Sequence, residues 1–342
     1  MALKLSYYGR TDQGLVRPAN EDNLLMLPER NLFVVCDGMG GHSAGEVASR
    51  TAVGAISATF NFDGSELADD PLLNLEEDLP QQADLLVKSI RLANRRIHSR
   101  GNVDPNLNGM GTTVVGTAFS NKLVSITHVG DSRVYLFRNR ALTPLTSDHS
   151  WVAEVQAAGS VSEETASTLV NKNIITRALG VKETVEIDVR LEEIQSGDLY
   201  VLCSDGLCGY STDTEIERVI YNCKGDPRKS VDNLIQLAND RGGSDNVTVI
   251  CIKVEDTDKL GAFRTRLPIT IPVETSTTIE REDEWLETLA DRNRELLEKE
   301  AKSERIAVES PQTQGARGFM VLTLLVLLAL SVVFYLFFGE SV

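Results

Sequence analysis

The chain of 342 residues lacks several patterns that mark common protein classes. No two of its five cysteines are spaced as CxxC, and their number is odd, so neither a zinc site nor a disulfide framework is supported. No internal repeat is evident. Three of the cysteines, Cys36, Cys203 and Cys251, lie in apolar runs. This placement predicts buried, reduced thiols in a reducing compartment.

Positive charge is also scarce. The sequence has 34 Lys and Arg against 50 Asp and Glu, which gives a formal net charge of −16. A field of this sign repels phosphate backbones and excludes nucleic-acid binding as the main role. Aromatic residues make up only 6%, but 42% of the residues are apolar, which is enough for a packed core. Clustered acidic side chains would instead suit hard cations.

The N-terminal ten residues, MALKLSYYGR, contain no apolar segment of the kind that directs secretion. The long apolar run is at the other end, where 319–338 carries no charged side chain. As a helix this run would be about 30 Å long, the thickness of a hydrocarbon core. It predicts a single transmembrane helix followed by a short extracytoplasmic tail, 339–342. Arg317 precedes the run and Glu340 follows it. The positive-inside rule therefore predicts a tail-anchored membrane protein with its catalytic part in the cytoplasm.

Sequence texture divides the rest of the chain. Strand and helix patterns fill 1–254, which we interpret as one catalytic domain. Residues 255–279, rich in Pro and Thr towards their end, are expected to form an extended linker. Residues 280–305 are dense in charge and in helix formers, which indicates a juxtamembrane helix, either a solvated spacer or one strand of a weak coiled coil. A second linker, 306–318, leads to the apolar run.

Within the first domain, apolar runs rich in β-formers recur at 32–36, 123–129, 133–138, 199–203 and 247–254. Most of these runs neighbour one another along the chain and do not alternate strictly with helices. This arrangement favours an α+β layered fold with antiparallel sheets over a doubly wound parallel sheet.

Helical patterns lie between some of these runs. One face of a helix is marked by apolar residues three and four apart, at Ala83, Leu86, Ile90, Ala93 and Ile97. Thr212 and Glu215 have the spacing of a capping box. The dipeptide 226–227, Asp-Pro, supplies an N-cap and a first-turn proline for another helix.

Four aspartates stand where predicted strands begin or end. Asp37 and Asp205 each follow an apolar run and precede a glycine, Asp131 lies at a strand break, and Asp245 comes just before a strand. Each alone is compatible with an ordinary turn. If the strand ends meet at one edge of the sheets, however, the four carboxylates converge, and buried like charges require a counter-ion. A hard divalent cation with oxygen ligands meets that need, and the carbonyl of Gly38 is a further candidate ligand.

A second polar cluster lies in VRPANEDN, which contains Arg17, Glu21 and Asp22. A planar guanidinium beside a metal-binding acidic group is suited to grip a phosphate. A glycine-rich turn, DGMGGHSAGEVAS at 37–49, carries His42 and leads into a predicted helix. This turn matches neither GxGxxG nor the Walker pattern, so a nucleotide site is not indicated.

Taken in order, the motifs resemble the bacterial form of the metal-dependent serine/threonine protein phosphatases of type 2C, the PPM family. The resemblance rests on RPANED, FVVCDGMGGHSAGEVAS, GMGTTVV, HVGDSRVYLFR, LTSDHSWV, ITRALG, LYVLCSDGL and GGSDNVTVI. These motifs span about residues 7 to 254 and say nothing about 255–342. The resemblance implies a central β-sandwich of two antiparallel sheets flanked by α-helices, with the site at one end of the sandwich.

The same resemblance implies the cofactors and their ligands. Two Mn²⁺ or Mg²⁺ ions would be held by Asp37, the Gly38 carbonyl, Asp205 and Asp245, with a third, weaker ion near Asp131 and Asp205. Glu21, Asp22 and Asn246 would lie behind these ligands, acting through water or as hydrogen-bonding partners. Arg17 matches the phosphate-binding arginine of the family.

Two further expectations follow from the resemblance. The histidine proposed as general acid in eukaryotic members directly follows Asp-Gly, but here Met39 stands in that place and His42 follows three residues later. The proton donor is therefore either His42 or metal-bound water. A mobile flap beside the site would comprise roughly 149–173, with Asp148 capping a short helix that ends near Gly159.

These observations together predict a protein serine/threonine phosphatase in which a water bridging two metals attacks phosphorus in line, without a phosphoenzyme. No cysteine begins a CxxxxxR loop, which disfavours thiolate catalysis. The expected substrates are phosphoserine and phosphothreonine proteins near a membrane, including a transmembrane serine/threonine kinase and its targets. Two alternatives remain: a catalytically silent, membrane-bound phosphoprotein-binding module, and a metal-dependent phosphatase of small phosphoesters.

Overall fold

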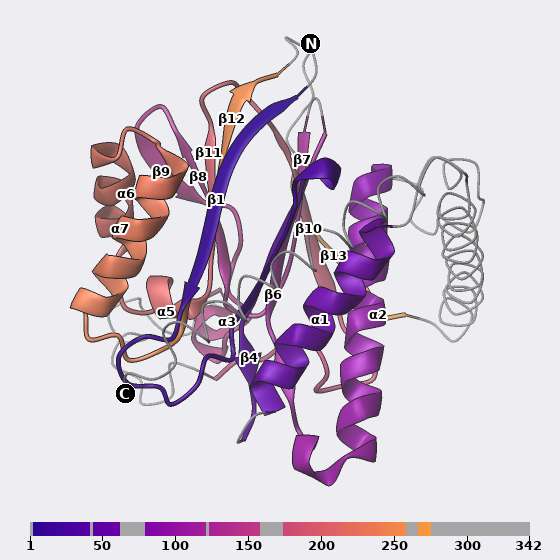
Figure 1. Cartoon of the computed structure of the whole chain (residues 1–342). Helices are drawn as coiled ribbons and strands as arrows, with labels where there is room; N and C mark the ends of the chain where they lie inside the picture. The colour runs from indigo at the N-terminus through magenta and orange to yellow at the C-terminus, as the bar shows by residue number, and fades with distance from the viewer. Residues whose placement is uncertain are drawn as a thin grey trace, which may run out of the picture. The chain divides into compact units, whose positions relative to one another are not determined.

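Two antiparallel β-sheets face each other in the computed structural model, and helices cover the outer face of each sheet (Figure 1). The structure describes residues 3–41, 44–61, 79–120, 123–157, 174–257 and 266–274, all of which belong to one unit, Met1–Glu282. The expected α+β sandwich of antiparallel sheets is thus confirmed.

One sheet has five strands in the order β1-β12-β11-β8-β9. Their bounds are β1 Lys4–Asp12, β12 Val247–Asp256, β11 Leu199–Cys203, β8 Arg133–Arg138 and β9 Ala141–Pro144. β11 is buried along its whole length because it is central in the sheet and covered on both faces. Such a strand reads in sequence as a continuous apolar run.

The other sheet has six strands in the order β13-β10-β7-β6-β3-β2. Their bounds are β13 Arg266–Ile271, β10 Ile187–Glu193, β7 Leu123–Val129, β6 Val114–Phe119, β3 Leu32–Cys36 and β2 Asn23–Leu27. A short ribbon of β4 (Gly38–Met39) and β5 (Gly111–Thr112) extends beyond the ends of β3 and β6. The side chains between the two sheets form one core that includes Phe33, Phe119 and Tyr200, all fully buried.

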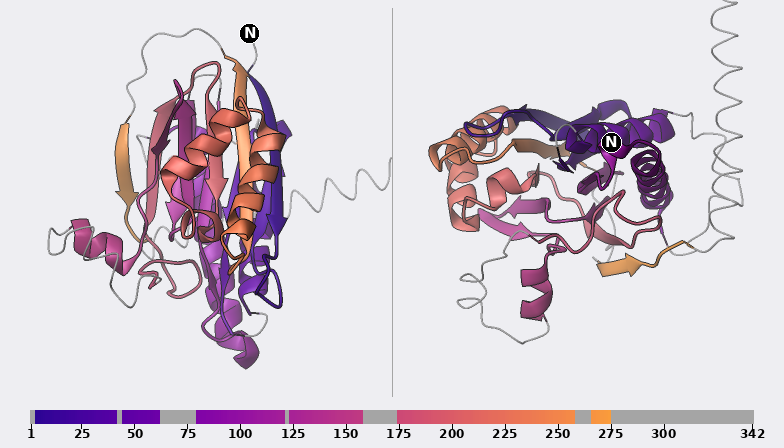
Figure 2. Two further views of the ribbon diagram at one scale, coloured as in Figure 1. Left: turned by 90° about the vertical axis from the view of Figure 1, so that its left-hand side faces the viewer. Right: turned by 90° about the horizontal axis from the view of Figure 1, so that it is seen from below.

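Helices complete the outer layers (Figure 2). α1 (Ala44–Asn61) and α2 (Gln81–Val103) cover the six-stranded sheet, while α5 (Asp205–Cys208), α6 (Asp213–Asn222) and α7 (Pro227–Asp240) cover the five-stranded sheet. Among the described residues, the other helical elements are α3 (Trp151–Ala157) and the short turns η1 (Pro28–Arg30) and η2 (Pro105–Leu107).

The helix ends form largely as the sequence predicts. The five predicted residues of α2 are all buried, which confirms its apolar face. The Thr212 hydroxyl and the Glu215 side chain make the expected capping box of α6, and the Asp226 carboxylate accepts from the Lys229 amide at the start of α7. One cap was predicted wrongly. Ser150, not Asp148, accepts from the third amide of α3, because the Asp148 carboxylate is engaged by both Nε and Nη2 of Arg133.

The segment 266–271 departs from the expected linker 255–279. It is extended, as predicted, but it pairs with β10 as the outermost strand of the six-stranded sheet. Its flanks are also held, since the Arg91 guanidinium donates to the Pro272 carbonyl and Arg95 forms an ion pair with Glu274. The catalytic unit therefore extends past residue 254.

Within the described residues, no helix has both the length and the apolar content needed to cross a bilayer. The predicted anchor 319–338, the charged helix 280–305, the linker 306–318 and the tail 339–342 lie outside the described residues. So do His42 and most of the predicted flap, 158–173.

Candidate active site

A cavity of about 310 Å³ opens at one end of the sandwich, where several strand ends meet. Asp37 lies directly after β3, Asp205 begins α5 after β11, and Asp245 lies two residues before β12. These three aspartates line the cavity together with Gly38, and Arg17 and Glu21 join them from the loop between β1 and β2. The structure therefore gathers side chains that are more than 200 positions apart in sequence, as the strand-end placement predicts.

The backbone around Asp37 is fixed by threonines of β5 and the residue after it. The Asp37 amide donates to the Thr113 hydroxyl at 3.0 Å, and its carbonyl accepts from the Thr113 amide and the Thr112 hydroxyl, each at 2.8 Å. Gly38 follows in a tight place: a Cβ there would lie 2.2 Å from the Gly45 carbonyl oxygen and 2.5 Å from that of Glu21. Only glycine fits, which keeps the first turn of α1 and the Glu21 backbone against this strand end.

Asp22 points into the sandwich from the same loop and is 7% exposed. Its Oδ2 atom accepts from the Ser204 hydroxyl at 2.8 Å and from the Thr248 hydroxyl at 2.7 Å. Ser204 precedes Asp205, and Thr248 is near the start of β12. Asp22 thus joins the two strand ends that carry Asp205 and Asp245.

Asn246 ties the loop between β1 and β2 to the start of β12. Its Oδ1 accepts from the Glu21 amide, and its Nδ2 donates to the carbonyls of Gln13 and Ala19, each at 2.9 Å. All of its side-chain bonds go to backbone groups. The residue therefore holds the loop that carries Arg17 and Glu21, and both N–H groups of its side chain are used in doing so.

The site concentrates negative charge at low solvent exposure. Burial, followed by the charges of Asp22 and Asp205, raises the pKa of Asp37 well above its ordinary value. Burial together with neighbouring aspartates raises the pKa of Asp22 and that of Asp131 to about 7. The pKa of Asp205 is raised by burial and by Asp245. Without a positive partner, this arrangement disfavours the charged carboxylates.

Arg17 supplies part of that positive partner. Its Nη2 lies 2.7 Å from Asp245 Oδ2, and this hydrogen bond raises the pKa of the guanidinium. Half of the Arg17 side chain is exposed at the cavity. Among the described residues, no other acidic side chain lies within ion-pair distance of Arg17. Its charge also acts on Asp205, but burial and Asp245 outweigh it and keep the pKa of Asp205 raised.

The donor set fits divalent cations. The cavity offers carboxylate and carbonyl oxygens, which are the ligands preferred by Mn²⁺ and Mg²⁺. Two buried oxygens, Glu21 Oε1 and Asp131 Oδ1, have no hydrogen-bond partner. Buried acceptors without partners are costly, and a bound ion or its water would satisfy them. Asp131 is not among the residues that line the cavity, but after burial the charge of Asp205 contributes most to raising its pKa.

Two apolar residues at the cavity were not predicted as site residues. Met39 lines it from β4, and Ile175 lines it from the chain that follows the predicted flap. The sequence signal for Met39 was its place directly after Asp-Gly, and that for Ile175 was its place at the start of the ITRALG motif. His42 lies outside the described residues, so its predicted role as proton donor stays a prediction.

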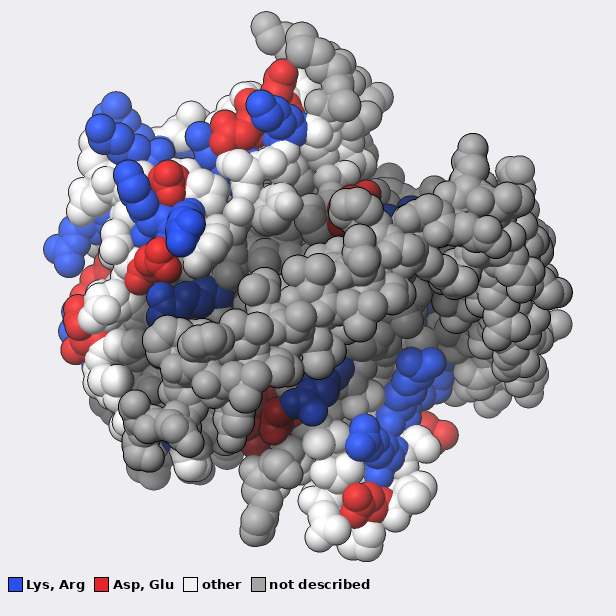
Figure 3. Space-filling view, in the orientation of Figure 1, with Lys and Arg blue, Asp and Glu red and all other residues white. Residues whose placement is uncertain are grey.

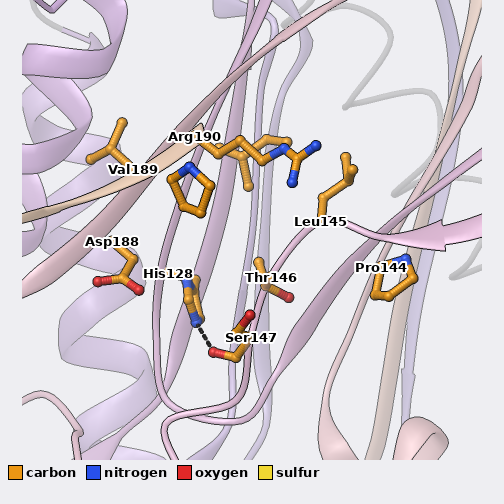
Figure 4. A pocket seen from close by; sticks show the side chains of 10 residues that line it. His128, Pro144, Leu145, Thr146, Ser147, Asp188, Val189 and Arg190 are labelled. Atoms are coloured by element: carbon orange, nitrogen blue, oxygen red, sulfur yellow. Dashed lines mark hydrogen bonds between the residues drawn. The ribbon is translucent and has the colours of Figure 1, made fainter. Parts of the chain in front are cut away.

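A second polar cluster, missed from the sequence, has two of its members on the six-stranded sheet, and none of its members lines the acidic cavity. It comprises His128 of β7, Asp188 of β10, His149 and Arg177. Three ligand atoms of His128, His149 and Asp188 lie within 4.8 Å of one another, a spacing that a metal ion accepts. Figure 4 shows His128 and Asp188 at a small cavity of about 70 Å³, with His128 donating to the Ser147 carbonyl.

The hydrogen bonds argue against a metal ion in this cluster. The Gly130 amide donates to His149 Nδ1, so the proton of neutral His149 is on Nε2, which donates to Asp188. Arg177 also donates to Asp188, at 3.0 Å, and already supplies a positive charge there. Burial raises the pKa of Asp188, but bonds from His149 and Thr270 outweigh burial and hold it below its usual value. The cluster therefore binds together the two ends of the segment 149–177.

The protein-family model described as Protein phosphatase 2C matches residues 18–239. The serine/threonine phosphatase stp of Listeria monocytogenes serotype 4b is 39% identical over 253 residues, covering 73% of this chain and 96% of that protein. The serine/threonine protein phosphatase PstP of Mycobacterium tuberculosis is 36% identical over 261 residues, covering 75% of this chain and 46% of that protein.

Solved structures show the same similarity. The crystal structure of the Mycobacterium tuberculosis phosphatase PstP/Ppp superposes with a TM-score of 0.64 at 34% identity, covering 74% of this chain and 99% of that one. The catalytic domain of PstP in complex with two manganese ions gives a TM-score of 0.63 at 35% identity, covering 74% of this chain and all of that one.

Proposed function

This chain belongs to the protein phosphatase 2C family and is a metal-dependent phosphoprotein phosphatase of the serine/threonine class, and on this premise we propose how it works. It hydrolyses phosphoserine and phosphothreonine esters by direct in-line attack of water on phosphorus, without a phosphoenzyme. The convergence of Asp37, Asp205 and Asp245 with Arg17 around one cavity is the observation that carries this proposal.

The side chains divide the work by their position. Asp37, Asp205, Asp245 and the Gly38 carbonyl form the oxygen-lined wall that would hold two Mn²⁺ or Mg²⁺ ions, and Asp131 with Asp205 would hold a weaker third. When bound, such ions activate water as a nucleophile and neutralise phosphate charge. Arg17 faces the cavity and binds the phosphate oxygens through its planar guanidinium. The candidate proton donor to the leaving alkoxide oxygen is either His42 or metal-bound water.

The cysteine thiols are poorly placed to form a phosphoenzyme. All five cysteines are free and buried, and burial contributes to raising the pKa of Cys36, Cys208 and Cys251 above its ordinary value. The thiolate form needed for attack is therefore disfavoured at neutral pH. None of the five lines the acidic cavity. A cysteinyl-phosphate intermediate is therefore disfavoured, in keeping with water as the proposed nucleophile.

The test is hydrolysis of p-nitrophenyl phosphate and of a phosphothreonine peptide by the full-length protein across a Mn²⁺ titration. Asp37→Asn and Asp245→Asn should each lower kcat by about a thousandfold, since metal activation contributes several kcal/mol. Asp240→Asn, an exposed position on α7, is the matched control and should keep the wild-type rate. Activity that persists in EDTA or in Asp37→Asn would refute the mechanism. A faster rate on nucleotides than on phosphopeptides would point to small phosphoesters.

We also propose that 319–338 anchors the enzyme in a membrane with its catalytic unit in the cytoplasm. The support is the uncharged run itself, with Arg317 before it and Glu340 after it. Tethering would raise the effective concentration of membrane-proximal substrates, including a transmembrane serine/threonine kinase and its targets. A variant that ends at residue 318 should leave the membrane fraction and dephosphorylate such targets more slowly. Unchanged fractionation would exclude the anchor.

A further inference from the structure

A groove of about 320 Å³ adjoins the acidic cavity. The two share Met39 and Ile175 as lining residues, so the groove starts where the candidate active site ends. Its remaining lining comes mainly from residues 176–186, with Val273 from the segment that follows β13. It has no carboxylate in common with the acidic cavity.

A protein substrate has to continue beyond the acidic cavity. A space of about 310 Å³ holds a phosphorylated side chain, but not the polypeptide on either side of it. An extended chain advances about 3.3 Å per residue, so the neighbours of the phosphorylated residue must lie on the adjoining surface. The groove is such a surface, since it borders the cavity directly.

The chemistry of the groove favours an apolar side chain. Val181 and Val273 are 53% and 46% exposed, and both line the groove. Two of its charged groups are already engaged. Arg177 is bonded to Glu186 and Asp188, and Glu154 accepts from the Thr176 hydroxyl. Lys182, which is exposed, also lines the groove, and burial of the two valines against an apolar partner is the apolar contact that a substrate would gain.

The wall that carries Val273 is fixed in place. The preceding residue accepts from Arg91 through its carbonyl, and the following residue, Glu274, forms an ion pair with Arg95 at 3.2 Å. Further back, Thr270 donates to Asp188, which also receives Arg177. The Asp188 carboxylate therefore fixes both walls of the groove, so the groove is preorganised for its substrate.

We propose that this groove binds the polypeptide next to the phosphorylated residue, with an apolar side chain of the substrate against Val181 and Val273. The inference rests on the proposed function, because it assigns the protein substrate of the same site. It gives the segment 266–274 a part in substrate recognition, although its sequence reads as a linker.

The test compares two phosphothreonine peptides, one with leucines beside the phosphothreonine and one with glycines, using the full-length protein. The wild-type protein should prefer the leucine peptide about tenfold in kcat/KM, the scale of one modest apolar contact. Val273→Asp and the milder Val273→Ser and Val181→Ser should remove most of that preference. Val103→Asp, an exposed valine that lines neither cavity, is the matched control and should retain it.

Hydrolysis of p-nitrophenyl phosphate, which has no chain to place in the groove, separates the two proposals. Equal p-nitrophenyl phosphate rates in all variants with a lost leucine preference support the groove. A leucine preference retained in Val273→Ser and Val181→Ser, or a wild-type enzyme with no preference, overturns the groove and leaves the phosphatase mechanism standing. Failure of the wild-type protein to hydrolyse either substrate with Mn²⁺ present overturns the mechanism itself.

Discussion

Two buried aspartates of the site are held in different ways. Asp22 accepts hydrogen bonds from two hydroxyl groups, whereas Asp131 has one oxygen, Oδ1, without a partner. Both have a pKa of about 7 because burial outweighs what their partners provide. No side-chain hydroxyl among the described residues donates to Asp131. Substitution of Asp131 therefore tests most directly what it costs to bury an unbalanced carboxylate.

The metal-free protein should lose stability as the pH rises towards 7. The pKa of Asp131 is near 3.8 in the unfolded chain and about 7 in the folded one, so between these values the folded state keeps a proton that the unfolded state has released. The stability that this proton provides is complete below about pH 4 and is lost as the pH passes 7. The loss amounts to at most about 4 kcal/mol.

The measurement is urea unfolding at pH 5 and pH 7.5 in EDTA, for the wild-type protein and Asp131→Asn. The amide that replaces the Asp131 carboxyl group is uncharged at both pH values. The variant should therefore lose less stability over this interval than the wild type. Asp240→Asn should behave like the wild type. An equal loss in Asp131→Asn and wild type would show that Asp131 is solvated or balanced in the folded protein.

Asn246 acts on the site through the backbone. Asn246→Ala would remove three hydrogen bonds to the loop between β1 and β2 and leave partly buried groups without partners. We expect a loss of roughly 2–4 kcal/mol in unfolding free energy and a rise in KM for phosphate esters, because Arg17 would no longer be held. Chemical unfolding and steady-state kinetics measure both. The exposed Asn222→Ala should change neither, and an unaltered KM in Asn246→Ala would contradict the positioning role.

At the level of elements, four strands, β3, β7, β8 and β11, have the predicted bounds. β3 and β11 are buried along their whole length, and each forms a continuous apolar run in the sequence. β13 was missed as a strand of the sheet because Pro268, with the proline and threonines that follow it, gives this stretch the composition of a linker. Its place in the sheet depends on pairing with β10, a strand distant in the sequence, which the local sequence does not indicate.

In the site, too, some features could be predicted from the sequence and others could not. The strand ends placed Asp37, Asp205 and Asp245 correctly, because their position in the sequence fixes their position at the sheet edge. The partners of Asp22 and Asn246 could not be predicted, since they come from hydroxyl and backbone groups far along the chain. The prediction that Asp148 caps a helix was wrong for a similar reason. Its carboxylate forms an ion pair with Arg133, the first residue of β8.

The capping box of α6 gives an element-scale prediction. Thr212→Ala removes the hydroxyl that accepts from the Glu215 amide and should cost about 1 kcal/mol of unfolding free energy. Thr214→Ala, an exposed position within the same helix, is the control and should be neutral or slightly stabilising. Urea unfolding at pH 7 with saturating Mn²⁺ compares them. Equal effects of the two substitutions would mean that solvent replaces the cap.

Across the whole catalytic unit, charge is separated along β12. Asp245 lies just before its first residue, and Lys253 lies near its other end beside Lys224, Arg228 and Lys229. Figure 3 shows Lys and Arg side chains at the upper left, over α6 and α7, with Asp and Glu side chains among them. Of the described residues that line the acidic cavity, Arg17 alone is basic, so the cavity has an excess of negative charge that attracts cations.

Mn²⁺ should stabilise the folded protein by binding at the acidic end. At a concentration of 100 Kd, one site adds about 2.7 kcal/mol, which corresponds to a rise in Tm of roughly 5–10 °C. EDTA should reverse the shift. Asp37→Asn and Asp205→Asn should show a much smaller rise, and Asp240→Asn the full one. A full rise in Asp37→Asn would mean that the ion binds elsewhere.

The pairing of β13 has a consequence for shortened versions of the enzyme. A fragment that stops at residue 257 keeps every aspartate of the site, yet it uncovers the hydrogen-bonding edge of β10. Unpaired strand edges recruit strands from neighbouring molecules. Such a fragment should therefore self-associate in light scattering and gel filtration, while one that stops at residue 274 stays monomeric. We therefore expect the nine residues 266–274 to protect the edge of β10 from pairing with other molecules.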